Sequence, residues 1–579
     1  MVSNRYILAG LNLVLLILIG CKTSEVVSGS KEPATDRQLS DKEYREFQVA
    51  YMDGNREKIL GNYQKAEALF QKALEIDPNS AATKFELAKL GMEKGELEKA
   101  IEYAKQAREA DPDNPWYSEF LARAYAEGGR LEEAIEVIRD ILDEHPEKYD
   151  YYFNLASLLS ARGRHDEALK IYDDLESQFG AVEEISMQRQ MIYLDQGNSE
   201  KALEEVNNLI ELNPDEVRYL GMKAEILEEQ GKIEEARKLY EDILVMDPDN
   251  GLVLLALYEI DEGTGKKEEA KAYLVGAFKS AELSIDVKVN ILLNMLNRRD
   301  VDQDFLIKLS DELVDTHAKN AKSHAIRGDI FNNFQMPEKA LESFEKAVEI
   351  DPNRPPIWQE IMILNSSLNR FEEMKSASEK ALEYFPQQPI FYLFNGIALQ
   401  QLGNHEEAIA TLNAGKNLVI ENNDLLGQFH SSLGDAYHAL ENHELSDKAY
   451  DKALKYSPSN VIVLNNYAYY LALRGQKLEK AEEMAKKAND LSPDQSSFQD
   501  TYAWVLFKRG NYQNALFWIQ EAIKNSGSSD PEVLEHHGDI LHALGRTKDA
   551  VAAWQMAIEA GGNASALTEK IEKNDKSEQ

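Results

Sequence analysis

Proline recurs along this chain at a fixed interval, and that interval restricts what the chain can fold into. The interval is 34 residues, or twice 34, along the first five of these prolines, and it is 34 again between the last two. The prolines are Pro78, Pro112, Pro146, Pro214, Pro248, Pro352 and Pro386. A period of this length is typical of a small unit that cannot bury its apolar face alone and is stable only when stacked on its neighbours.

Small residues share the same period. When position one is set 31 residues before each proline, position twenty is alanine in most repeats: Ala66, Ala100, Ala134, Ala168, Ala202, Ala236, Ala270, Ala340, Ala408, Ala515 and Ala550. Position eight is glycine or alanine in most repeats, for example Gly54, Ala88, Gly328 and Gly538. Small residues at two fixed places would let two helix backbones approach closely there. The proline would end a helix, because it has no amide hydrogen to donate inside one.

This 34-residue pattern resembles the tetratricopeptide repeat, from about residue 47 to 564. The resemblance implies an all-α solenoid of about 15 repeats, each of two antiparallel helices, A and B, wound as a right-handed superhelix. We expect a regular N-terminal block at 47–286, irregular repeats at 287–388 and a C-terminal block at 389–564. The polar stretch from Glu559 is expected to form a short capping helix, followed by a charged tail at 565–579. The middle is irregular because Leu306, Met362 and Met374 stand where small residues are expected. Either it forms a soft joint, or the repeat has drifted there without loss of packing.

The N-terminus suggests a lipid anchor. Arg5 precedes an apolar stretch at 7–19, which is too short and interrupted for a confident membrane span. It ends in Leu-Ile-Gly-Cys, which resembles a bacterial lipobox and implies cleavage before Cys21 and acylation of that residue. Residues 1–20 would then be a signal peptide and 21–46 a flexible tether, with Lys22 favouring the outer membrane. The alternatives are an uncleaved anchor, or a signal peptide with a chance cysteine.

Composition and motifs argue against catalysis. The net charge of −38 would repel nucleic acid, and a single cysteine allows no intramolecular disulfide. The residues outside the array are too few for a catalytic domain. The stretch 261–270 lacks the glycine and hydroxyl of a phosphate-binding loop, and His443 begins an incomplete zinc motif. We therefore expect no enzyme activity, no cofactor, no metal and no small-molecule substrate. A metal at His536, Asp539 and His542 is the weaker alternative.

Partner proteins are expected on the A helices. In tetratricopeptide arrays positions two, five, nine and twelve usually face the concave groove, and aromatic residues with a few polar groups suit peptide binding. In the last three repeats the predicted binding residues are Asn465, Tyr469, Asp500, Trp504, Phe507, Glu535, Asp539 and His542. The alternative is that they pack against neighbouring A helices. These repeats lack the lysine, asparagine and arginine set that captures a C-terminal carboxylate.

The C-terminal third also resembles bacterial envelope tetratricopeptide lipoproteins. Their last three repeats show Asn-x-x-Gly/Ala-Tyr, Asp-Ser/Thr-x-Gly/Ala-Trp and His-x-Gly-Asp, matched here from Asn465, from Asp500 and around Gly538. The resemblance implies an interaction scaffold for envelope proteins, held by its lipid to the outer membrane and facing the periplasm. The alternative function is an accessory or regulatory subunit for processing exported polysaccharide or peptidoglycan.

Overall fold

The computed structural model describes residues 39–180, 182–298, 300, 302–526 and 529–575. The predicted signal peptide, Cys21 and most of the predicted tether lie outside these residues. Helix α1 begins at Asp41, so residues 41–46 of the predicted tether belong to a helix. The described residues contain helices and no strands, which confirms the all-α repeat fold. None of their helices is long and apolar enough to cross a membrane.

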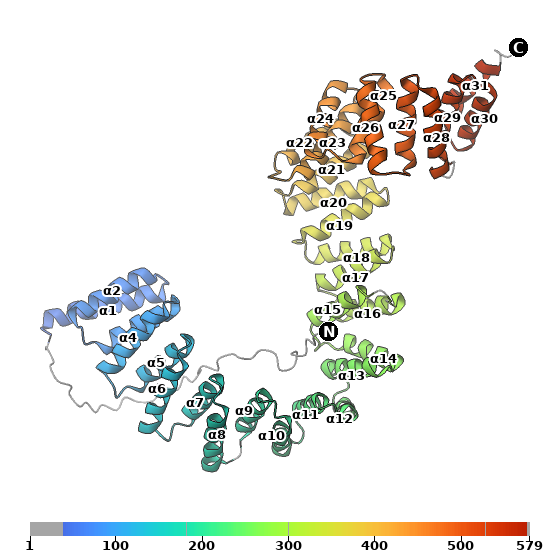
Figure 1. Ribbon diagram of the computed structural model, residues 1–579. Coiled ribbons are helices and arrows are strands. Elements are labelled where there is room, and N and C mark those ends of the chain that lie inside the picture. The colour runs from blue at the N-terminus through green and yellow to red at the C-terminus, as the bar shows by residue number, and fades with distance from the viewer. Residues whose placement is uncertain (1–38, 181, 299, 301, 527–528, 576–579) are drawn as a thin grey trace. The chain divides into compact units, whose positions relative to one another are not determined.

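The chain divides into two compact units, Met1–Gly231 and Lys232–Gln579. The helices of the N-terminal unit are α1 (Asp41–Ile59), α2 (Tyr63–Ile76), α3 (Ala81–Glu93), α4 (Leu97–Ala110), α5 (Pro115–Glu127), α6 (Leu131–Glu144), α7 (Tyr149–Ala161), α8 (His165–Phe179), α9 (Glu183–Asp195), α10 (Ser199–Leu212) and α11 (Val217–Glu229). Within this unit consecutive helices are antiparallel, and each pair lies beside the next (Figure 1).

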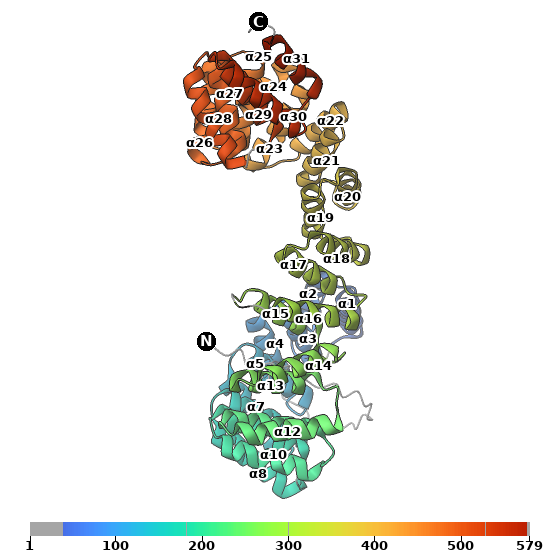
Figure 2. The same ribbon diagram turned by 90° about the vertical axis from the view of Figure 1, so that its right-hand side faces the viewer.

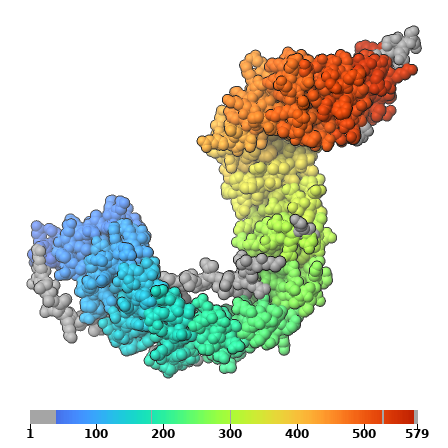
Figure 3. All heavy atoms as spheres, in the orientation of Figure 1, coloured from blue at the N-terminus to red at the C-terminus, as the bar shows by residue number. Residues whose placement is uncertain are grey.

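The C-terminal unit continues the same alternation. Its helices are α12 (Ile233–Met246), α13 (Gly251–Thr264), α14 (Lys267–Lys279), α15 (Ile285–Leu296), α16 (Gln303–Thr316), α17 (Ala321–Asn333), α18 (Pro337–Ile350), α19 (Pro355–Ser367), α20 (Phe371–Tyr384), α21 (Pro389–Gln401), α22 (His405–Lys416), α23 (Asn423–Ala439), α24 (His443–Tyr456), α25 (Val461–Arg474), α26 (Leu478–Leu491), α27 (Ser496–Lys508), α28 (Tyr512–Ser526), α29 (Pro531–Ala543), α30 (Thr547–Glu559) and α31 (Ala564–Asp575). Odd-numbered helices up to α29 are the predicted A helices, and even-numbered helices are the B helices (Figure 2). Pairs that follow one another within a unit pack without gaps (Figure 3).

The small residue at position eight makes room for a specific partner on helix B. A Cβ added to Gly328 would lie 2.6 Å from the ring of Phe344, and one added to Gly538 would lie 2.4 Å from the ring of Trp554. A Cβ added to Gly396 would likewise lie 2.5 Å from the side chain of Leu412. The glycine at position eight therefore leaves room for a side chain of helix B, as close packing requires.

The turns between and within repeats also form where the sequence predicts them. Helix α2 ends at Ile76, and the Asp77 carboxylate accepts a hydrogen bond of 3.1 Å from the amide of Asn79 in the turn. Inside the repeat, the turn after α3 passes through Gly95 with φ of +73°, which glycine adopts without strain.

Larger residues in the predicted irregular stretch are packed inside the repeats. Leu306, Met362 and Met374 are each 0% exposed. The stretch also buries Lys288, whose ammonium donates to the carbonyl oxygens of Phe278 at 2.8 Å and Ser280 at 2.7 Å. Those carbonyls lie at the end of α14, so this lysine ties α15 to the preceding helix. A soft joint at 287–388 stays a prediction.

The C-terminal end of the array is covered by α31, which occupies most of the predicted charged tail. Its Leu567 is fully buried. Its Lys570 ammonium donates to Glu535 at 2.8 Å and to Asp539 at 2.7 Å, both on α29. Helix α31 therefore gives the last repeat the polar cover that the end of a stack requires.

Candidate protein-interaction surfaces

The predicted binding residues of the last three repeats form a network between A helices. His536 on α29 donates from Nδ1 to Asp500 on α27, at 2.8 and 3.1 Å from the two carboxylate oxygens. Both side chains are buried. Burial alone would lower the pKa of His536, but the Asp500 carboxylate outweighs it and raises the pKa above its usual range. The pair is therefore a buried charged hydrogen bond that joins α27 to α29.

An aromatic stack extends this network. The ring of Trp504 stacks on that of His536 with centroids 3.9 Å apart. The ring of Phe507 also stacks on Trp504, with centroids 4.9 Å apart. The ammonium of Lys508 lies 4.4 Å from the Trp504 ring centroid. Trp504 is only 7% exposed. Its ring is thus largely used in packing between A helices, where stacking adds to apolar burial.

Tyr469 reaches across a whole repeat. Its hydroxyl, on α25, donates to the Glu532 carboxylate on α29. Burial and that carboxylate raise the pKa of Tyr469 well above its usual range. The contact skips α27, so side chains of α25 and α29 meet across it. The ring of His536, which contacts both Asp500 and Trp504, also lies with its centroid 6.3 Å from that of Tyr469.

The eight predicted residues therefore divide by exposure. Asn465, Asp500 and Trp504 are buried; Tyr469, Phe507, Glu535 and Asp539 are partly buried; and His542 is exposed. Glu535 and Asp539 are held by Lys570 of α31. Asp500, Trp504 and Tyr469 thus contact neighbouring A helices, as the alternative expects, and binding at the eight residues stays a prediction.

The weaker metal alternative is not supported by the geometry at α29. His536 turns to Asp500, whereas Asp539 accepts from Trp554 Nε1 at 3.0 Å and from Lys570. Across the part of the chain that the structure describes, no group of three or more histidine, cysteine, aspartate or glutamate side chains is placed to hold a metal ion.

The charged pair at α29 predicts a pH dependence of local stability. Because the pKa of His536 is higher in the folded state than its ordinary value near 6.5, the pair stabilises fully below that ordinary value. The contribution is lost as pH rises through the folded pKa. We expect the amide protection factors of α27 and α29 to fall as pH rises above about 6.5 in the wild type. The fall should be absent in His536→Gln, and an equal fall in that variant would contradict the assignment.

A second surface lies on the A helices of the N-terminal unit. Trp116, at position two of α5, is 64% exposed. One and two turns further along the same face lie Phe120 and Arg123, whose guanidinium sits 4.8 Å from the Phe120 ring centroid. The Nε atom of Arg123 is buried without a hydrogen-bond partner among the described residues. We call Phe85, Lys89, Trp116, Phe120 and Arg123 the aromatic–basic face.

Helix α3 supplies the rest of this face. Phe85 contacts Phe120 edge-to-face with centroids 5.1 Å apart, and the Lys89 ammonium lies 4.6 Å from the Phe85 centroid. Lys89 pairs with the buried Glu86, which also pairs with Lys58 of α1. Two lysines thus share one carboxylate, and Arg123 adds a further positive charge. The face is locally cationic in a chain whose net charge is −38.

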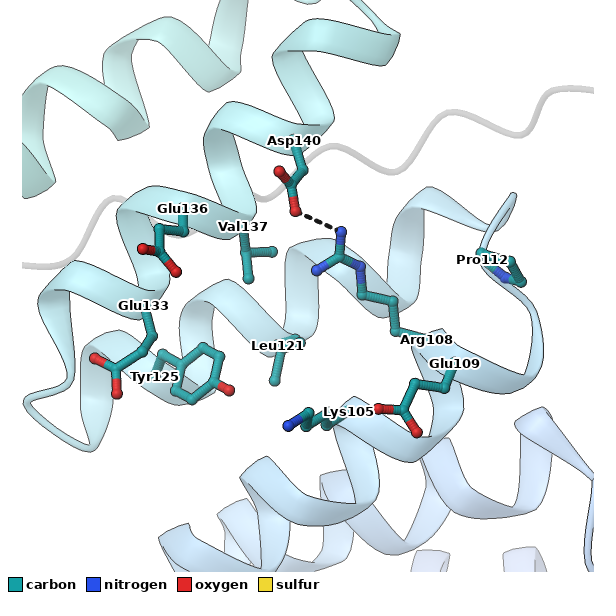
Figure 4. Close-up of a pocket in the computed structure, with 10 residues that line it drawn as sticks. All are labelled: Lys105, Arg108, Glu109, Pro112, Leu121, Tyr125, Glu133, Glu136, Val137 and Asp140. Carbon is teal, nitrogen blue, oxygen red and sulfur yellow. Dashed lines mark hydrogen bonds and ion pairs between the residues drawn. The ribbon is translucent and has the colours of Figure 1, made fainter.

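A shallow pocket lies on the opposite side of these repeats, between α4, α5 and α6 (Figure 4). Its volume is about 360 Å³, and Leu121, Tyr125 and Val137 supply its apolar lining. An ion pair of 2.8 Å between Arg108 and Asp140 joins α4 to α6 beside it. Its rim carries both signs of charge, so it selects no class of ligand.

Comparison with protein families decides what kind of chain this is. Family models described as tetratricopeptide repeat match residues 59–124, 92–159, 125–187, 191–251, 321–354 and 427–560. Together these stretches cover more than half of the chain. This chain is a tetratricopeptide-repeat protein. Tetratricopeptide-repeat proteins act as protein–protein interaction scaffolds, and membership points to protein partners and to a non-catalytic role.

Two curated relatives share part of this tetratricopeptide sequence. Human mitochondrial import receptor subunit TOM70 is 22% identical over 273 residues, which are 46% of this chain and 44% of the relative. TPR repeat-containing protein PA4667 of Pseudomonas aeruginosa is 27% identical over 171 residues, 29% of this chain and 28% of the relative. The chain spans less than half the length of either relative.

Solved structures align along most of the chain but loosely. The structure of Naa15/Naa10 bound to HypK-THB covers 92% of this chain and 95% of its own at 16% identity, with a TM-score of 0.35. The APC/C hetero-tetramer Cut9–Hcn1 covers 86% and 96% at 14% identity, with a TM-score of 0.36.

The aromatic–basic face could have been found in the sequence by comparing the charge at one position of the tetratricopeptide repeat along the chain. Position nine is cationic at Lys89 and Arg123, but in the later repeats it is anionic or neutral, with carboxylates at Glu225, Asp329 and Asp435. Burial, with a smaller effect of Glu360, raises the pKa of Asp329 to about 6. A comparison of one position across all repeats, rather than of the last three alone, singles out the N-terminal repeats.

Proposed function

We propose that this chain is a lipid-anchored scaffold of the bacterial cell envelope that holds a partner protein on its aromatic–basic face. The anchor is acylated Cys21, and the location is the outer membrane on its periplasmic side. Support for the anchor is the single cysteine at the end of the apolar N-terminal stretch, with Lys22 after it. The family supplies the scaffold role, since these proteins act through protein partners.

The observation that carries the choice of site is the exposed indole of Trp116 on the same helix face as Arg123, whose buried Nε has no hydrogen-bond partner among the described residues. A buried polar group without a partner costs stability unless a ligand satisfies it. Exposed tryptophan and arginine are the residue types that dominate binding energy at interfaces. The partner segment is therefore expected to carry acidic groups for the cations and apolar groups for the rings.

The test is site-specific photo-crosslinking in the producing cells. A photoreactive amino acid replaces Trp116 in one variant and exposed Lys72 on α2 in the control. We expect a defined envelope protein to be captured at position 116 and not at 72. Arg123→Glu should reduce capture when the photoreactive group stands at position 82, exposed at position two of α3. Capture that is equal at 72 and 116, or co-purification of polysaccharide in place of protein, would overturn the proposal.

A further inference from the structure

The first helix carries large apolar side chains on its outer face. Val49 is 61% exposed, Met52 69% and Ile59 81%. Among the described residues, six of the 23 large apolar residues that are exposed lie within 44–63. Such a concentration marks a contact surface, because single exposed apolar residues are otherwise scattered over a protein.

Comparison between repeats shows why this face is open. Val49 stands at position three, and later position-three residues of the same unit are buried: Tyr117 is 8% exposed, Ile185 0% and Tyr219 1%. Each later A helix of this unit has a preceding repeat beside it, whereas α1 is the first helix among the residues that the structure describes. The last repeat is covered by α31, so the two ends of the array differ. The open end of a stack normally has a polar cover.

Charge on this face is as distinctive as its apolar content. One exposed stripe runs along α1 with alternating steps of three and four residues: Lys42, Arg45, Val49, Met52, Arg56 and Ile59. We call these six residues the α1 stripe. It contains no acidic residue, although acidic residues outnumber basic ones in the chain by 102 to 64. The acidic partners lie to the side, with Glu46 3.8 Å from Lys42 and Asp53 3.2 Å from Arg56.

A helix face of alternating cations and apolar side chains suits the surface of a phospholipid bilayer. Its apolar groups enter the boundary between headgroups and acyl chains, while its cations meet phosphate. Chain length fits this occupant, since Cys21 precedes Asp41 by twenty residues. A flexible segment of that length has a reach of about 25 Å, so a lipid at Cys21 keeps α1 close to the membrane.

We infer that the α1 stripe lies on the phospholipid surface and sets the orientation of the first repeats there. The inference rests on the proposed lipid anchor for the nearness of the membrane. It adds a second contact beside a tether that by itself leaves orientation free. The aromatic–basic face would then be presented at a fixed angle to the membrane.

Flotation with lipid vesicles tests the stripe separately from the anchor. The chain from Lys22 to Gln579 has no lipid site and keeps every described helix. It is mixed with vesicles of phosphatidylethanolamine and phosphatidylglycerol. We expect the wild-type chain to float with the vesicles. The variant Val49→Ser/Met52→Ser/Ile59→Ser should have an affinity for the vesicles that is lower by about tenfold or more. The control Leu212→Ser/Val245→Ser/Met246→Ser removes three other exposed apolar residues and should float like the wild type.

A fluorescent probe identifies what covers the stripe. The same chain has no cysteine, so Met52→Cys and, as control, Lys72→Cys each carry one environment-sensitive dye. Vesicles should shift the emission at position 52 to shorter wavelength, with quenching by brominated lipid, and leave position 72 unchanged. No shift at 52 would overturn the inference. A shift without vesicles together with a doubled mass in light scattering would also overturn it, in favour of a second copy. A negative result for the α1 stripe does not change the crosslinking result at position 116, so the stripe and the aromatic–basic face are tested independently.

Discussion

Ala340→Trp should unfold the helix pair α17–α18 while the other repeats remain folded. Ala340 is fully buried at position twenty, where α18 approaches α17 closely enough that Gly328 and Phe344 leave no spare volume. Added methylenes in such a seam cost about 1–3 kcal/mol, and an indole adds far more volume than that. We therefore expect a loss of unfolding free energy at or above the upper end of this range. Rapid amide exchange and new protease cleavage at 321–350 would show it.

The control is Glu342→Trp, which places the same side chain on the exposed face of the same helix. Its free energy of unfolding should lie within about 0.5 kcal/mol of that of the wild type, as is usual for surface substitutions. If Ala340→Trp left exchange and cleavage at 321–350 unchanged, the assignment of position twenty to the A–B seam would be wrong.

Cys21→Ala should release the protein from carbonate-washed membranes. Several acyl chains on one residue give a strong anchor, because each buried methylene contributes about 0.8 kcal/mol. The α1 stripe alone is a peripheral contact that the carbonate wash removes. Lys22→Ala is the matched control, since it changes the next residue and leaves the cysteine in place. The measurement is the fraction of protein in the pellet by immunoblot. Retention of Cys21→Ala at the level of the control would contradict the lipid anchor.

The repeat was predictable because the contacts that define it form within one 34-residue unit, between fixed positions of that unit. An alanine or glycine at position eight or twenty reports a close approach of two helices, and the structure places Gly538 against Trp554 as that argument requires. The end of the array was predictable in kind, because the polar stretch from Glu559 suggested a short capping helix followed by a charged tail. The length of the helix was not predictable. Leu567 and Lys570 hold residues 565–575 as a helix against α29, in a stretch expected to be a tail.

The binding residues were the harder part. The register says which face of α27 Trp504 lies on, but its exposure depends on how tightly neighbouring A helices close over that face. In this protein Tyr469 meets Glu532 across α27, a contact between residues 63 apart in sequence, and Trp504 is covered. Trp116 stands at position two, which is exposed in most repeats, and is 64% exposed. Trp504 stands at position nine, so the register separates the two tryptophans, but the contact that covers Trp504 is between distant repeats and cannot be read from one repeat.

The central claim is that the chain holds its partner at the membrane, and one measurement tests it most directly. The protein captured at position 116 is quantified in membrane and soluble fractions of cells that carry the wild type, Cys21→Ala combined with Val49→Ser/Met52→Ser/Ile59→Ser, or Trp116→Ala/Arg123→Glu. The account predicts that the partner shifts to the soluble fraction in both variants, with the scaffold leaving the membrane only in the variant that lacks Cys21 and the apolar residues of the α1 stripe. A partner that stays fully at the membrane in both variants would contradict it.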